Sequence, residues 1–97
     1  MGVTLSDRVT VHPSVISREL AGETVLLNLE SGVYYGLDSV GTRVWQLLQQ
    51  DKTLADVCLV MVDEYDAPAD VLQHDISTLV HELCEKQLLM PRQLPKA

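Results

Sequence analysis

The chain has little positive charge and no long apolar run. Its 97 residues include 7 Lys and Arg against 14 Asp and Glu, and the formal net charge at pH 7 is −7. A protein this acidic repels polyanions, so the charge disfavours a nucleic-acid partner. The apolar stretches fall short of the ~20 residues that a membrane-spanning helix needs, and the N-terminus lacks the basic and then apolar pattern of a secretory signal. We therefore expect a cytoplasmic protein with no membrane partner.

Cysteine is also scarce, because Cys58 and Cys84 are the only two. Two cysteines are too few for a disulfide framework, and both lie beside apolar positions of predicted helices, so we expect reduced, small hydrophobic residues of the core. A chain of this length fits one domain, which buries about 60–70% of its surface on folding. We expect this domain to span residues 8–91, after a flexible lead-in at residues 1–7 and before a C-terminal tail at residues 92–97.

Three extended segments joined by short connections predict a three-stranded antiparallel sheet. Glu30–Gly32 supplies a hairpin turn between the second segment and the third, because Gly32 can take a positive φ. Connections of only a few residues favour an antiparallel meander, and its last strand would form one edge of the sheet. The three predicted strands are Val15–Leu20, Thr24–Leu29 and Val33–Leu37, and a further short strand is expected at Val9–Val11.

Apolar residues at helical spacing predict three helices after the sheet. Asp38 or Ser39 can cap the first, Thr53 can cap the second, and Pro68 is well placed in the first turn of the third. Trp45 lies on the apolar stripe of the first helix, so we expect it in the core. The fold class is therefore α+β and winged-helix-like, with a three-stranded antiparallel sheet followed by three helices. The predicted helices end near Leu48, Tyr65 and Gln87, and a small strand could follow at Leu88–Met90.

The resemblance to a winged helix in overall shape makes a transcription regulator the alternative hypothesis. A recognition helix usually gathers Arg or Lys on one face, where they contact phosphates and bases. The third predicted helix instead offers four acidic residues and a single lysine, and a DNA duplex would repel that face. These residues are Asp70, Asp75, Glu82, Glu85 and Lys86.

Side chains that could support catalysis or metal binding do not converge on one site. His74 and His81 share a face of the third predicted helix, but seven residues of helix separate them by about 10 Å, which one ion cannot bridge. Asp63, Glu64 and Asp66 form an acidic cluster at the end of the second helix, where charge is usually solvated. We therefore expect a protein that is not an enzyme and that has no cofactor or metal of its own.

Tyr34 and Tyr35 are adjacent in the predicted edge strand, so their side chains must point to opposite faces. One ring can pack inward while the other faces outward, where its amphipathic surface could anchor a bound peptide. An outward tyrosine is equally an ordinary residue of a sheet surface. The register of the strand, which the sequence does not fix, decides between the two tyrosines.

The motif Leu27-Asn28-Leu29-x-Ser31-Gly32-x-Tyr34-Tyr35-x-Leu37-Asp38-x-x-Gly41-x-x-Val44-Trp45-x-Leu47-Leu48 combines the hairpin, the helix cap and the start of the first helix. With this motif, residues 8–91 resemble the PqqD-like family of peptide chaperones, also called RiPP recognition elements. The resemblance implies that the chain binds the leader segment of a ribosomally synthesised precursor peptide by β-strand addition and presents it to a modifying enzyme. That partner would be a radical S-adenosylmethionine enzyme in pyrroloquinoline quinone biosynthesis, or a leader peptidase in lasso-peptide and related pathways.

The resemblance also implies where the peptide would bind. The leader would pair with the strand Val33–Leu37, in which Gly36 would leave space for a close backbone or a bulky leader side chain. One flank of the third helix would form the opposite wall; the other flank, with Gln73, Val80 and Cys84, is the alternative, and helical angle alone cannot choose between them. The expected peptide-binding residues are Val33, Tyr34, Tyr35, Gly36, Leu37, Val71, Asp75, Thr78, Leu79 and Glu82.

Overall fold

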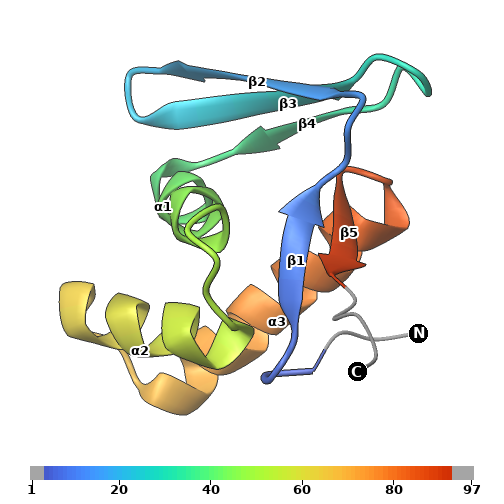
Figure 1. Cartoon of the computed structure of the whole chain (residues 1–97). Helices are drawn as coiled ribbons and strands as arrows, with labels where there is room; N and C mark the ends of the chain where they lie inside the picture. Colours follow the sequence, from blue (N-terminus) through green and yellow to red (C-terminus); the bar gives the residue numbers. More distant parts are fainter. Residues whose placement is uncertain (1–3, 93–97) are drawn as a thin grey trace, which may run out of the picture.

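The structure is a computed structural model that describes residues 4–92. It confirms the α+β class, with a three-stranded antiparallel sheet followed by three helices (Figure 1). A second sheet of two strands lies apart from the first. The elements in chain order are β1 (Arg8–Val11), β2 (Val15–Leu20), β3 (Glu23–Asn28), β4 (Tyr34–Leu37), α1 (Ser39–Leu48), α2 (Leu54–Glu64), α3 (Ala69–Glu85) and β5 (Leu89–Arg92).

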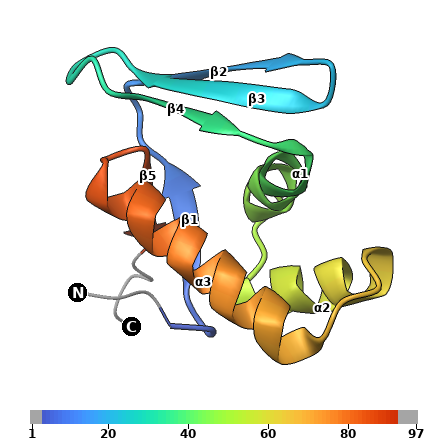
Figure 2. The same cartoon turned by 180° about the vertical axis from the view of Figure 1, so that it is seen from behind.

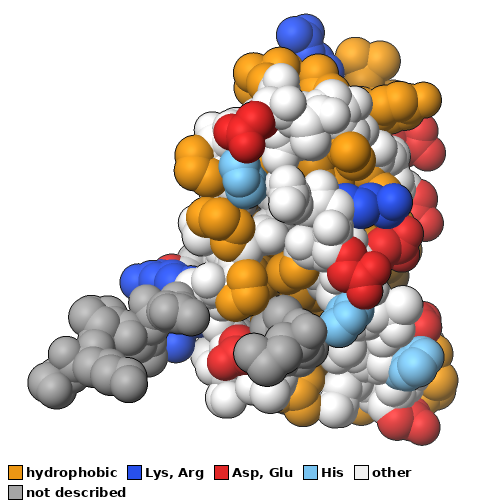
Figure 3. Space-filling model, turned by 90° about the vertical axis from the view of Figure 1, so that its right-hand side faces the viewer, with side chains coloured by type: hydrophobic (Ala, Val, Ile, Leu, Met, Phe, Trp, Pro, Cys, Tyr) orange, Lys and Arg blue, Asp and Glu red, His pale blue; other side chains and the backbone are white. Residues whose placement is uncertain are grey.

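The three-stranded sheet has the order β2-β3-β4, and α1 lies directly beneath it (Figures 1 and 2). Ala21 and Gly22 join β2 to β3 with φ angles of 53° and 80°, the positive values that a two-residue hairpin turn requires. Gly32 has a φ of 76° in the turn before β4, as expected. The face of the sheet that points away from α1 carries exposed apolar side chains, and hydrophobic side chains gather at this end of the molecule (Figure 3).

The second sheet pairs β1 with β5 in an antiparallel register, with Val9 opposite Pro91. Short strands were expected near both positions, but their pairing was not. It brings the two ends of the described chain together, and the side chains of Arg8 and Arg92 both form ion pairs with Asp51.

The expected lead-in at residues 1–7 lies partly outside the described residues. Within it, the carbonyl groups of Leu5 and Asp7 accept hydrogen bonds from Ala55 and Leu54 at 2.8 and 3.0 Å, at the start of α2. Residues 93–97 of the expected tail lie outside the described residues, and Arg92 is the last residue of β5.

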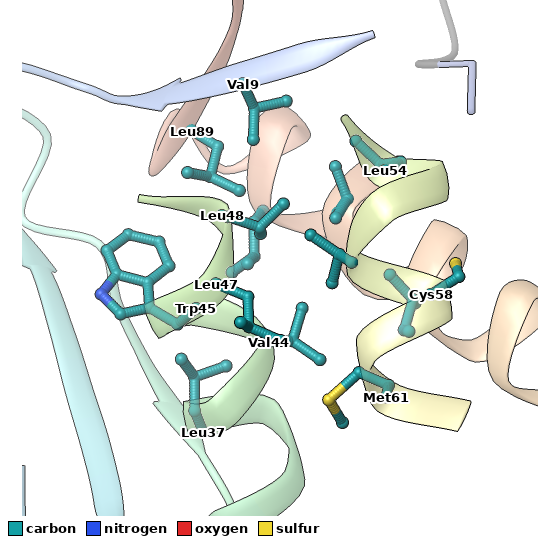
Figure 4. Close-up of a cluster of buried hydrophobic side chains, with 14 of the residues drawn as sticks. Val9, Leu37, Val44, Trp45, Leu47, Leu48, Leu54, Cys58, Met61 and Leu89 are labelled. Atoms are coloured by element: carbon teal, nitrogen blue, oxygen red, sulfur yellow. The ribbon is translucent and has the colours of Figure 1, made fainter. Parts of the chain in front are cut away.

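The core lies between the sheet and the helices, and all three helices contribute to it (Figure 4). Trp45 is buried beside Leu37 and Val44, which confirms its expected place. Cys58 is buried and Cys84 is half-buried against the same core, and both are free thiols. Burial raises the pKa of each thiol above its ordinary value, so these cysteines behave as small hydrophobic residues.

Local hydrogen bonds fix where the first two helices begin. The Asp38 carboxylate accepts from the Gly41 N–H at 2.8 Å, so Asp38 rather than Ser39 is the N-cap of α1. A Cβ atom on Gly41 would lie only 3.3 Å from Asp38 Oδ1 and from Leu37 Cδ2, which explains the glycine in this turn. Thr53 and Asp56 form a reciprocal capping box at the start of α2. Within residues 4–92, no helix combines the length and the apolar character that crossing a membrane requires.

One buried polar residue, Asn28, ties the sheet to the end of α3. Its side chain donates to the Gln87 carbonyl at 2.8 Å and accepts from the N–H groups of Glu30 and Ser31 at 2.9 and 3.1 Å. Because these bonds satisfy the buried amide, Asn28 can fix both the hairpin turn and the position of that turn over α3.

Candidate functional site

Strand β4 forms one edge of the three-stranded sheet, because it pairs with β3 and with no other strand among residues 4–92. Its residues Tyr34 and Gly36 lie on the outer face of the sheet, whereas Tyr35 and Leu37 lie on the face that packs against the core. Tyr34 is 74% exposed, and Tyr35 is half-buried. The structure therefore decides which of the two tyrosines points outward.

The hydrogen bonds of the hairpin also fix which backbone groups of β4 face outward. Asn28 N–H donates to the Val33 carbonyl at 2.9 Å, so these two residues form a hydrogen-bonded pair. Hydrogen-bonded and non-hydrogen-bonded pairs alternate in antiparallel sheets, which makes Tyr35 the next β4 residue bonded to β3. The backbone groups of Tyr34 and Gly36 therefore point away from the sheet and are available to a further strand.

A cavity of about 390 Å³ opens beside this edge, between β4, the first turns of α1 and the middle of α3. Figure 2 shows how these three elements are arranged, with β4 above α3 and α1 beside them. The wall is mainly apolar, and two carboxylates stand among the apolar side chains. The lining residues are Tyr35, Gly36, Leu37, Asp38, Val40, Gly41, Val44, Leu72, Asp75, Ile76 and Leu79.

The structure brings half of the expected peptide-binding residues to this cavity. Tyr35, Gly36, Leu37, Asp75 and Leu79 line it. Val33 and Tyr34 belong to the same hairpin but not to the lining, and Val71 is 48% exposed on α3.

Thr78 and Glu82 belong to a neighbouring hollow of about 350 Å³ along α3. Of the alternative flank of α3, Val80 is fully buried, and neither Gln73 nor Cys84 lines the cavity. The flank that carries Asp75 and Leu79 is therefore the one that faces β4.

Sequence reasoning missed the floor of the cavity. Val44, Leu72 and Ile76 lie at the helical spacing that is typical of core residues, but this spacing shows only that a side chain points inward and not that it borders a cavity. Val40 is 38% exposed although it belongs to the apolar stripe of α1. The available signal for it was an apolar residue in the first turn, two positions after the capping aspartate.

Negative charge surrounds the half-buried tyrosine of this site. The pKa of the Tyr35 hydroxyl is raised, first by burial, then by a hydrogen bond to the Glu82 carboxylate and by the negative charges of Glu82 and Asp38. The hydroxyl therefore stays protonated beside the carboxylate of Glu82 on α3. The apolar cavity has an acidic rim, so we expect it to repel an acidic peptide and to favour a neutral or basic one.

The histidines and the acidic cluster lie away from the cavity. His74 and His81 line the neighbouring hollow, and His81 Nε2 lies 3.3 Å from the Glu85 carboxylate. Glu64 forms an ion pair with Arg43 at 2.6 Å, and this contact lowers the pKa of the Glu64 carboxyl. None of these side chains lines the cavity beside β4.

The chain is similar in sequence to a curated protein and in fold to solved structures. A curated relative, the PqqA binding protein of Rhizobium meliloti (strain 1021), is 26% identical over 87 residues, which are 90% of this chain and 83% of the relative. The solved structure of TbiB1 in complex with the TbiA(beta) leader peptide has a TM-score of 0.81 and 30% identity, and the match covers 88% of this chain and 99% of that one.

The structure of lasso peptide synthetase B1 complexed with the leader peptide has a TM-score of 0.80 and 26% identity, over 87% of this chain and 99% of that one. The family model described as coenzyme PQQ synthesis protein D (PqqD) matches residues 23–89, from the first residue of β3 to the first residue of β5. With the family model covering most of its length, the chain belongs to the PqqD family.

Proposed function

We propose that this chain is a noncatalytic peptide chaperone, which binds the leader segment of a ribosomally synthesised precursor peptide and presents it to a modifying enzyme. The leader would add to the edge of β4 as a fourth strand. The observation that carries the proposal is the position of the unpaired edge of β4 directly beside an apolar cavity. Strand addition obtains affinity from the backbone groups of the edge and specificity from side-chain pockets, and this site supplies both.

The register of β4 sets how an added strand would lie. In an antiparallel addition, leader residues opposite Tyr34 and Gly36 would exchange backbone hydrogen bonds with them, because those groups point outward. Leader residues opposite Tyr35 and Leu37 would share their face of the sheet and point into the cavity. Two leader side chains at positions i and i+2 would therefore enter the space between β4 and α3.

The names of the similar proteins support this proposal. The relative from Rhizobium meliloti is called a PqqA binding protein, and both solved structures hold a leader peptide. Since this chain matches nearly the full length of both solved structures, the same kind of ligand is the best candidate here. The pathway would be pyrroloquinoline quinone biosynthesis, lasso-peptide biosynthesis or a related maturation of a ribosomal peptide.

A noncatalytic role accords with the chemistry of the side chains. A cysteine nucleophile reacts as the thiolate, and burial raises the pKa of both Cys58 and Cys84, which keeps them protonated. Any reaction on the precursor would then take place on the partner, a radical S-adenosylmethionine enzyme or a leader peptidase. Such a pathway places the chain in the cytoplasm, where precursor peptides are made.

The alternative, a winged-helix transcription regulator, has no observation in its favour. The exposed face of α3 carries Asp70, Asp75 and Glu85, and an acidic helix releases no counterions from DNA. We expect no salt-sensitive binding in an anisotropy titration with duplex DNA at low salt. Sequence-selective binding in that assay would contradict the proposal.

The direct test is a titration of the isotope-labelled protein with synthetic leader peptides of precursors encoded near its gene. We expect a dissociation constant of about micromolar order or lower, because the edge and the cavity are both formed in the free protein. Amide shifts should concentrate in β4 and on the cavity face of α3. Absence of binding to every such peptide would contradict the proposed function, and binding with shifts confined to β2 would contradict the proposed site.

A further inference from the structure

The outer face of the three-stranded sheet is unusually apolar for a surface open to solvent. Ile16, Leu20, Val25 and Tyr34 lie on this face and are between 52% and 74% exposed. Figure 3 shows hydrophobic side chains together with a basic one at this end of the molecule. The proposed leader strand would extend this face by one strand.

Gly36 interrupts the face at its edge. It lies opposite Val25 on β3, and Val25 lies opposite Arg18 on β2, so the three form one row across the sheet. A Cβ atom on Gly36 would have no heavy atom of its surroundings within 4 Å, and the φ of Gly36 lies outside the left-handed region. Neither crowding nor backbone conformation therefore requires glycine at this position.

The register of β4 shows which leader residue would lie next to the missing side chain of Gly36. The leader residue opposite Gly36 would form a hydrogen-bonded pair with it, and its side chain would stand on the outer face, beside Tyr34. A glycine in a strand leaves room for a large cross-strand side chain to lie across it, and aromatic residues compensate best for the missing side chain.

We infer that Gly36 is a specificity-determining position, which admits a large apolar leader side chain, preferentially an aromatic one, across the edge of the sheet onto Val25 and against the Tyr34 ring. This inference rests on the proposed function, because it concerns the same bound strand. The recognition at Gly36 differs from that in the cavity. The leader residue opposite Gly36 stands on the outer face of the sheet and alternates with the leader residues that point toward α3. The leader would thus be recognised from both faces.

The test uses a display library of random twelve-residue peptides, selected on the full chain and then on variants. Selected peptides that lose binding to Tyr34→Pro occupy the β4 edge, and we expect them to share an aromatic residue at one fixed position. Replacing this residue by alanine should weaken binding to the parent protein about tenfold. A shared aromatic residue that can be replaced by alanine without loss would overturn the inference.

Gly36→Val is the informative variant, because a β-branched residue suits a strand and its Cβ would have no heavy atom of its surroundings within 4 Å in the free protein. We expect unchanged or higher thermal stability and about tenfold weaker binding of the aromatic peptide. The alanine analogue of this peptide should bind the variant within about twofold of its affinity for the parent protein. Gly36→Ala should give a smaller effect in the same direction. Arg18→Val is the matched control, since it changes the same row two strands away from the edge.

The outcomes separate the two proposals. If no peptide at all is enriched at β4, the proposed function fails and this inference fails with it. If peptides bind at β4 but Gly36→Val leaves the aromatic peptide unaffected, only this inference is overturned. If Gly36→Val weakens the aromatic peptide and its alanine analogue equally, Gly36 serves close backbone approach rather than side-chain selection, and the inference is also overturned.

Discussion

The two edges of the three-stranded sheet differ in what lies beside them. On β2, as on β4, alternate residues turn their backbone groups outward; the Leu29 N–H donates to Ser14 O at 2.8 Å, so the groups of Ser17 face away from β3. Yet no residue of β2 lines the cavity, and its Glu19 carboxylate accepts a hydrogen bond from Gln46 at 3.0 Å. An unpaired edge is therefore common to both strands, and only β4 combines it with an apolar cavity.

The largest expected effect is a loss of folding stability, which would remove both edges of the sheet together. Trp45→Ala should lower the free energy of unfolding by about 3–5 kcal/mol, since the ring is 4% exposed and its loss leaves a large void in the core. Urea denaturation followed by circular dichroism would measure this change. A stability close to that of the parent would contradict the core position of Trp45.

Prolines placed on the two edges test the comparison directly. Tyr34→Pro removes an outward N–H from β4, so we expect leader affinity to fall about 30-fold or more. Ser17→Pro removes the equivalent group from β2 and should leave affinity within about twofold. Calorimetric titration with the same leader peptide measures both.

Tyr34→Ala keeps the N–H and separates the loss of the side chain from the loss of the hydrogen bond. Tyr35→Pro, by contrast, removes a group bonded to β3 and should destabilise the sheet itself. If Ser17→Pro proved the more damaging to binding, β2 would be the docking edge.

The wall of the cavity on α3 should contribute less than the strand edge. Leu79 is partly buried against the core and lines the cavity, so Leu79→Ala should weaken leader binding about fivefold. Leu59→Ala is the matched control, because Leu59 is a helical leucine that is 69% exposed. Equal affinities for the two variants would show that the leader does not enter the cavity.

The smallest expected effect concerns the Tyr35 hydroxyl. Its pKa is raised in the folded protein, so the neutral hydroxyl stabilises the fold below pH 10, and this contribution is lost as the pH rises through the folded-state pKa. Tyr35→Phe should therefore show a weaker fall in urea midpoint between pH 7 and high pH than the parent. Tyr34→Phe, whose ring is exposed, is the control. Parallel pH profiles for Tyr35→Phe and the parent would contradict the raised pKa of Tyr35.

Local signals in the sequence carried the prediction of the sheet, the helices and their caps. The turn at Gly32, the cap at Asp38 and the capping threonine at Thr53 each act within a few residues, so their positions could be found without the fold. The pairing of β1 with β5 joins segments from opposite ends of the chain, so no local sequence pattern predicts it.

The candidate site could be predicted only in part, for a physical reason. A shift of one residue in register moves every side chain of a strand to the other face, so the sequence could not decide between Tyr34 and Tyr35. The cavity wall on α1 and α3 consists of residues such as Val44 and Ile76, whose inward direction was clear. Whether they also border a cavity depends on how far apart β4 and α3 are held, and this distance is a property of the assembled fold.

The bond from Asn28 to Gln87 bears on how a precursor and its chaperone can evolve together. It fixes the spacing of the sheet and α3 at the hairpin end of the site, near Tyr35 and Glu82, whereas at the Leu37 end the spacing is set by side chains that can repack. Leader residues bound near Leu37 should therefore tolerate more sequence change than those bound near Tyr35. Positions bound near Tyr35 are expected to stay constant across a lineage, and those near Leu37 to vary in size with compensating changes at Val40 or Leu72.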